Sequence, residues 1–197
     1  MIQLLPGAWC WSAFDADKKF NFNGHILRTE KGTVIVDPVA FSPDDLAVVE
    51  ACGLEPDALV LTNRNHIRAR DSVLARWKGI PTIGHEAEKD EFGFAPDRLV
   101  KDGEVVLGLV ALHLPGKSPG ELGLYWPERR ALLLGDALIA PNGKLKTVPA
   151  EKQDDPARLR KSLETLRGYD FDHLLVGDGD PLLGDAKSAV VAWLKSA

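Results

Sequence analysis

The stretch His113–Asp136 constrains the fold of this chain more than any other part of the sequence. It reads HLPGKSPGELGLYWPERRALLLGD, so that two Pro-Gly dipeptides enclose Lys117 and Ser118 between two apolar segments. Pro-Gly pairs favour turns, and the pattern therefore predicts a strand, a tight polar loop and a second strand. The apolar run 132–134 then ends in a Gly-Asp dipeptide, which puts the Asp136 carboxylate at the end of a buried strand. A charge in that position requires a partner.

Short apolar strands alternate with capped helices in both halves of the chain, which indicates a layered α/β protein. One helix is predicted to begin at Ser42, with Cys52 facing inward near its end, and another to begin at Asp155. Proline follows each of these two caps at the first helical position. The chain has 197 residues, of which 45% are hydrophobic, so it can bury one sizeable core. We expect a single domain over residues 1–197.

The distribution of charge and apolar residues argues against several classes of partner. The net charge is −5, and positive and negative residues are interspersed, so no basic stripe favours nucleic acid. No stretch approaches the roughly 18 apolar residues of a membrane span, and the first residues lack the basic and apolar regions of a secretory leader. Cys10 and Cys52 lack the spacing of metal ligands, which favours reduced thiols. We expect a cytoplasmic protein whose partner is a small molecule, with no nucleic-acid or membrane partner.

The polar loop and the Gly-Asp strand end resemble the metallo-β-lactamase superfamily, whose members carry a PGHTPG-type loop followed by a strand that ends in GD. The resemblance implies an α/β fold of four layers, an αββα sandwich with two mixed sheets inside and helices outside. It also implies that the loops 62–68, 115–120 and 177–180 meet Asp136 at one edge, where the family holds one or two metal ions. In this sequence Lys117 stands in place of the family's loop histidine.

The segment TNRNHIR, in the first of these loops, departs from the THxHxDH motif of that family. Aligned without a gap, the two leading histidines become Asn63 and Asn65. The aspartate becomes Ile67, and the last histidine becomes Arg68. With a two-residue deletion, His66 is instead the one histidine that survives, and both alignments remain open. In either case the cluster of three imidazoles that holds the first zinc ion is lost, because amide side chains are poor zinc ligands.

Two carboxylates match metal-ligand positions of this family, and they require a counter-ion. Asp136 matches an aspartate that often bridges the family's metals, and Asp178 replaces the histidine of the family's GHG motif. Two carboxylates in a partly buried cleft repel each other, so a cation is required there. Lys117 is the predicted donor of that charge, with Arg64 or Arg68 as the alternative. A second interpretation also stays open, in which Lys117 points to solvent and backbone amides bind the carboxylates.

Other polar residues are given structural interpretations. Asp37 follows a β-branched strand and is predicted to organise the neighbouring loop. The acidic residues between Glu86 and Glu91 favour a solvated helix face over a metal site. His113 is interpreted as a hydrogen-bonded residue at a strand end.

The sequence supports three functional hypotheses. In the first, the site has lost its dinuclear zinc, has no cofactor, and belongs to a pseudo-hydrolase or small-molecule binder. In the second, Asp136, Asp178 and His66 hold one divalent ion, manganese, iron, magnesium or weakly bound zinc, in a hydrolase. In the third, the chain is a protein-interaction module with an unused cleft. The candidate residues of the cleft are Asn63, Asn65, His66, Arg68, Lys117, Ser118, Asp136 and Asp178.

Overall fold

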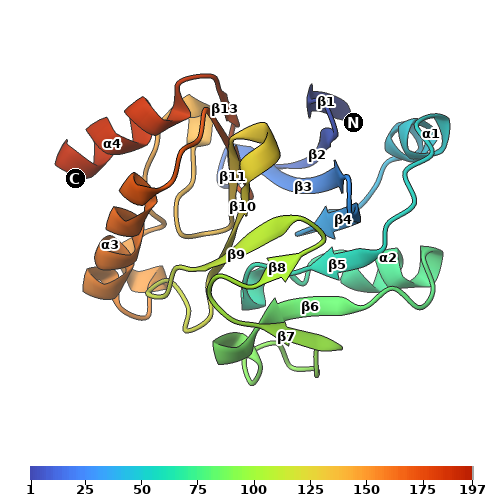
Figure 1. The fold of residues 1–197 in the computed structure, drawn as a ribbon, viewed down its shortest axis with the longest axis horizontal. Helices are drawn as coiled ribbons and strands as arrows, with labels where there is room; N and C mark the ends of the chain where they lie inside the picture. Colours follow the sequence, from blue (N-terminus) through green and yellow to red (C-terminus); the bar gives the residue numbers. More distant parts are fainter. Residues whose placement is uncertain (197) are drawn as a thin grey trace.

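The computed structural model describes residues 1–196 and contains two mixed β-sheets packed face to face between two layers of helices (Figure 1). The first sheet holds strands β1 to β7 in sequence order, which are Ile2–Leu5, Ala8–Asp15, Phe20–Thr29, Gly32–Val36, Ala58–Val60, Thr82–His85 and Arg98–Val100. The second sheet has the order β13-β12-β11-β10-β9-β8, and from β8 to β13 its strands are Val105–Val106, Leu109–His113, Leu122–Trp126, Ala131–Leu134, His173–Val176 and Leu182–Leu183. Helices α1 (Pro43–Ala51) and α2 (Arg70–Arg76) cover the first sheet, and α3 (Pro156–Glu164) and α4 (Ala186–Ser196) cover the second. The αββα sandwich that the resemblance implied is therefore confirmed.

Alternation of side chains along the strands divides the apolar residues among three cores. In β4, Val34 and Val36 pack in the core between the sheets, whereas Ile35 packs beneath α1 and α2. In β11, Leu133 joins the core between the sheets, and Leu132 packs beneath α3 and α4. Each of these side chains is buried, which contributes about 1.5 to 3 kcal/mol per residue. The loops at the strand ends therefore rest on a well-packed frame.

The helix starts follow from local capping chemistry. Ser42 Oγ accepts the backbone N–H of Asp45 at 3.1 Å, and the Asp45 carboxylate accepts the N–H of Ser42 at 2.9 Å, which confirms Ser42 as an N-cap. Asp155 caps α3 by accepting a backbone N–H of the first turn. The prediction that Cys52 faces inward is wrong, because α1 ends at Ala51 and Cys52, which follows it, is exposed. None of the helices in residues 1–196 combines the length and the apolar character that a membrane crossing needs.

The carboxyl ends of parallel strands bring the site loops to one edge of the sandwich. Strands β4 and β5 run parallel in the first sheet, as do β11 and β12 in the second. At this edge the two sheets are joined directly, since the Leu122 N–H donates to the Thr62 carbonyl at 2.8 Å. The Asn23 side-chain amide donates to the carbonyls of Val176 and Gly179 at 2.9 and 2.7 Å. The loops at this edge therefore stand on a seam of hydrogen bonds between the sheets.

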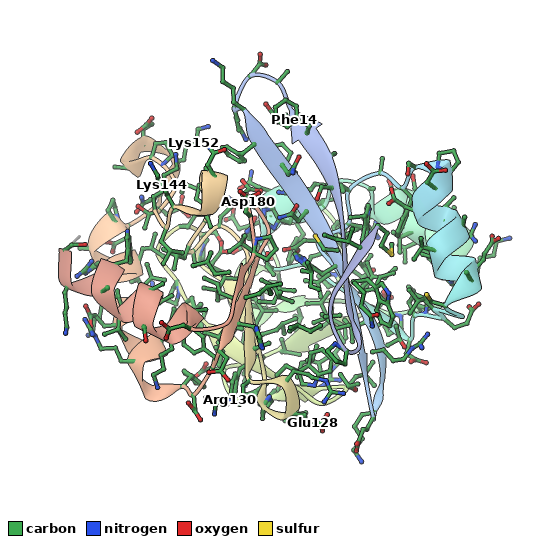
Figure 2. The ribbon with its side chains drawn as sticks, turned by 90° about the horizontal axis from the view of Figure 1, so that it is seen from above. Phe14, Glu128, Arg130, Lys144, Lys152 and Asp180 are labelled. Carbon is green, nitrogen blue, oxygen red and sulfur yellow. The ribbon has the colours of Figure 1, made fainter. Side chains whose placement is uncertain are left out.

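The β2–β3 hairpin extends past the body of the molecule. Figure 2 shows it projecting outward, with Phe14 near its tip and with Lys144 and Lys152 to one side of it. Lower on the hairpin, Phe22 forms an isolated β-bridge with Asp178. The hairpin and the segment between β11 and α3 both contribute residues to the lining of one cavity.

Candidate functional site

Lys117 is the centre of a buried polar cluster in the loop between β9 and β10. Its side chain is 5% exposed, and its Nζ lies 2.6 Å from Asp136 Oδ2. The ammonium also donates to Asn63 Oδ1 at 3.2 Å and to Asn65 Oδ1. An ammonium group has three N–H donors, so these three acceptors satisfy it completely. The predicted pairing of Lys117 with Asp136 is confirmed, and the alternative in which Lys117 points to solvent is wrong.

The second carboxylate of the site has a cation of its own. Arg68 Nη2 lies 2.8 Å from Asp178 Oδ1, and the Arg68 guanidinium lies 4.8 Å from the centre of the Phe22 ring. Burial raises the pKa of Asp178, and the neighbouring Asp136 carboxylate raises it further. Arg68, one of the alternatives to Lys117, therefore supplies the charge that Asp178 needs.

His66 lies between two carboxylates. Its Nδ1 lies 2.7 Å from Asp37 Oδ2, and its Nε2 lies 3.2 Å from Asp136 Oδ1. Burial by itself lowers the pKa of His66, but the two carboxylates raise it to about 10. The same contacts act on Asp136, because burial raises its pKa while the charges of His66 and Lys117 lower it well below the usual range. The imidazole is therefore an imidazolium that donates from both nitrogens.

Asp37 fixes this imidazolium from below, at the end of β4. Its Oδ1 accepts the backbone N–H of Thr62 at 2.8 Å, and its Oδ2 accepts the Thr62 hydroxyl at 2.6 Å. The side chain is fully buried. The prediction that Asp37 organises the neighbouring loop is confirmed.

The charge on His66 predicts that the free energy of unfolding falls as the pH becomes alkaline. The pKa of His66 is about 10 in the folded chain and 6.5 by its ordinary value, so the folded state holds this proton more tightly. We therefore expect the contribution of His66 to be fully present below pH 6.5 and to be lost as pH rises toward 10. Urea unfolding at several pH values measures this. Glu121, whose pKa is raised to about 8, also makes the free energy of unfolding fall with pH, but at lower pH. The effect of His66 is therefore best measured above pH 8.

His66→Gln is the matched variant for this measurement. Glutamine carries no charge that titrates in this range, so the variant should be less stable at pH 8 and should lose much of the slope above that pH. A wild-type chain whose free energy of unfolding stays constant from pH 8 to pH 10 would rule out the imidazolium.

Glu121 braces the site from beneath and was not predicted as a site residue. Its Oε1 accepts the backbone N–H groups of Asp136 and Ala137 at 2.8 and 3.2 Å. It also accepts the Asn63 side-chain amide at 3.1 Å. Burial raises the pKa of Glu121, the Asp136 carboxylate raises it further, and the result is about 8. The sequence feature that could have identified Glu121 is its position at the start of an apolar strand, where a charge needs buried partners.

Glu88 performs a similar role for two loops at once. The side chain is buried, with Oε1 accepting the Arg64 N–H at 2.9 Å and Oε2 accepting the Gly120 N–H at 2.7 Å. The interpretation of residues 86–91 as a solvated face is therefore wrong for Glu88, because the side chain is buried and accepts two backbone N–H groups. The approach is close: a Cβ on Gly120 would lie 2.5 Å from the Glu88 backbone nitrogen. Only glycine fits in the loop at that point.

The structure brings together all of the candidate residues except Ser118. Asn63 and Asn65 both contact Lys117, and Arg68 contacts Asp178, as the gap-free alignment implies. His66 contacts Asp136, as the alignment with the deletion implies, so the contacts are compatible with both. Ser118 is buried under the loop, where its hydroxyl donates to Glu121 at 3.4 Å.

A cavity of about 780 Å³ opens over this cluster. His66, Lys117, Asp136 and Asp178 all belong to its lining. The volume is in the range of small-molecule sites in proteins. The converging loops therefore enclose a space in which a small molecule fits above two ion pairs.

Comparison with known proteins agrees with this fold. Residues 3–194 match the family model described as the metallo-beta-lactamase superfamily. The hydroxyacylglutathione hydrolase of Brucella anthropi is 31% identical over 131 residues, which cover 58% of this chain and 50% of that protein. The probable metallo-hydrolase YqgX of Bacillus subtilis is 29% identical over 140 residues, which cover 59% of this chain and 66% of that protein. The chain thus matches about half to two thirds of the length of these relatives.

Solved structures show the same fold at low sequence identity. TTHA1623 in a di-iron-bound form has a TM-score of 0.72 at 22% identity, with 92% of this chain and 96% of that chain covered. The metallo-beta-lactamase from Pontibacter korlensis has a TM-score of 0.77 at 13% identity, with 100% and 98% covered. With a family model that spans nearly every residue, this chain belongs to the metallo-beta-lactamase superfamily.

Proposed function

We propose that this chain binds a small molecule in its cleft without a resident pair of metal ions. The observation that carries the proposal is the position of the Lys117 ammonium. It occupies the point on which Asn63, Asn65 and Asp136 converge, and its three protons are all accepted there. A side-chain cation thus neutralises the site from within.

The donors in the cleft do not fit a dinuclear metal centre. His66, Asp136 and Asp178 each offer one ligand atom, and these atoms lie within 4.8 Å of one another. Each of the three is already bonded to a group of opposite charge. An added cation would face the ammonium of Lys117 and the guanidinium of Arg68 at close range, and both would have to leave. Among the described residues that line the cavity, His66 is the sole histidine.

The floor of the cleft is arranged to bind a molecule, with no group free to attack it. The ammonium of Lys117 has no lone pair for nucleophilic attack, and its three N–H groups are already accepted by neighbours. His66 donates from both nitrogens while it is protonated, so it has no lone pair to accept a proton from a substrate. The floor residues therefore act on a ligand through their position and charge.

Metal analysis of the purified protein tests this proposal. Protein prepared without chelator and then dialysed should hold well under one metal ion per chain, because each donor is already paired with a group of opposite charge. Elemental analysis for zinc, iron and manganese measures the content. Thermal unfolding with added ions is a second readout, since an ion at 100 times its Kd would raise the free energy of unfolding by about 2.7 kcal/mol. We expect no such rise.

A mononuclear metal-dependent hydrolase is the second candidate. The clustering of His66, Asp136 and Asp178 favours it, because an oxygen-rich set suits manganese, iron or magnesium. It predicts one ion per chain that survives dialysis and disappears in Asp136→Asn. That result would replace the first proposal with this one.

A further inference from the structure

The lining of the cleft has a charge opposite to that of the whole molecule. The chain carries a net charge of −5. The lining includes six cationic side chains, which are Lys18, Arg64, Arg68, Lys117, Lys146 and Lys152. It includes four anionic side chains, which are Asp136, Glu151, Asp154 and Asp178. Six positive and four negative groups leave an excess of two positive charges before His66 is counted. An acidic protein has therefore concentrated cations around one cavity.

The excess lies at the mouth of the cavity and not at its floor. Lys117 and Arg68 are paired with the two floor aspartates, and Arg64 lies 2.7 Å from Asp154. Within residues 1–196, no carboxylate comes within 4.0 Å of the Nζ atom of Lys18, Lys146 or Lys152. These three lysines are exposed and stand on two sides of the opening, Lys18 on the β2–β3 turn and the other two between β11 and α3. They are the cations that a ligand can reach.

Apolar side chains form the wall between the mouth and the floor. Phe20 and Phe22 make an edge-to-face pair with ring centres 5.9 Å apart. Ile139 and Val148 are buried and line the same cavity. Lys18 Nζ lies 4.3 Å from the centre of the Phe22 ring, so a free cation and an aromatic face are adjacent. A ligand that enters here meets positive charge first and an apolar wall next.

We propose that the cleft selects an organic anion, with an apolar body against Phe20 and Phe22 and an anionic head group at Lys146 and Lys152. This inference rests on the proposed function and names the class of its ligand. The floor cannot hold the head group, since its two cations are already paired. A cavity of about 780 Å³ accommodates a body of one or two rings together with its head group. Carboxylates and phosphate monoesters share the required chemistry.

Isothermal titration of the full chain with four probes tests the inference. 1-Naphthyl phosphate and 1-naphthoate carry the apolar body and a head group, 1-naphthol carries the body alone, and inorganic phosphate carries the charge alone. We expect both naphthyl anions to bind at least tenfold more tightly than 1-naphthol or inorganic phosphate, and to weaken as salt is added. Tighter binding of the phosphate would identify a phosphoryl head group, and tighter binding of the naphthoate a carboxylate.

The paired variants are Lys146→Gln with Lys152→Gln, and Lys144→Gln as the matched control. Lys144 is exposed in the same segment but does not line the cavity. The double variant should lose at least tenfold in affinity for the naphthyl anions, and the control should lose none. Equal losses in both variants, unchanged binding in the double variant, or binding of 1-naphthol as tight as that of the anions would overturn the inference. Each of these would leave the proposed function standing, because that function fails on retained metal and not on the choice of head group.

Discussion

The Lys117→Met variant is expected to unfold with a free energy roughly 3 to 5 kcal/mol below that of the wild type. Methionine keeps most of the length of the lysine side chain, so the loss reports the charge and its hydrogen bonds. Without the ammonium, Asp136 keeps only His66 as a charged partner, and the carbonyl oxygens of Asn63 and Asn65 lose their donor. Both members of the ion pair are more than nine-tenths buried, so few other groups can replace the missing contacts. Urea unfolding followed by circular dichroism measures the difference.

A double-mutant cycle separates the ion pair from packing. Adding Asp136→Asn to Lys117→Met removes the carboxylate that has lost its ammonium partner, so the two changes should cost less together than the sum of the single changes. Lys144→Met changes an exposed lysine and should stay within about 0.5 kcal/mol of the wild type. A Lys117→Met chain with the wild-type midpoint, or two changes that simply add, would show that Lys117 is not the counter-ion of Asp136.

Combining Asn63→His, Asn65→His and Lys117→His should convert the cation site into a zinc site. The three side chains already converge, because Lys117 Nζ contacts both asparagine oxygens, and Asp136, which follows β11 in the second sheet, supplies a fourth ligand. Three imidazoles and a carboxylate are a donor set that zinc binds in tetrahedral geometry. We expect one zinc ion per chain and an affinity at least a hundredfold above that of the wild type. Competition with a chromogenic chelator measures the affinity.

Two further variants are the controls for this conversion. Lys117→His alone removes the competing cation but adds only one imidazole, so it should bind zinc much more weakly than the triple variant. The triple variant with Asp136→Asn should also bind more weakly, because it lacks a charged ligand. If the triple variant folds and yet binds zinc no better than the wild type, the ammonium does not occupy a metal-like position.

Local sequence chemistry predicted the frame of this molecule and half of its site. The Pro-Gly turns around Lys117 and the caps at Ser42 and Asp155 depend on neighbours in the sequence, and each is present as expected. The need of Asp136 for a cation follows from burial alone, and the lysine in the nearest loop meets it.

The rest of the site depends on contacts between distant segments. Glu88 reads as one acid in a solvated run, because nothing near it in the sequence reveals that the N–H groups of Arg64 and Gly120 come to lie over it. The choice of Arg68 over Lys117 for Asp178 likewise depends on how the two sheets are placed relative to each other. Such pairings are decided by tertiary packing, which composition and periodicity do not describe.

The seam of hydrogen bonds between the sheets lets the floor and the mouth of the cleft accept amino-acid substitutions at different rates. Leu122 and Asn23 join the two sheets by hydrogen bonds immediately beneath the loops. A substitution at the floor of the cleft therefore also weakens the contact between the two sheets. The exposed lysines at the mouth do not contribute to the hydrogen bonds that join the two sheets. During evolution, substitutions of the exposed lysines can therefore change which ligand is bound, while the residues of the floor stay the same.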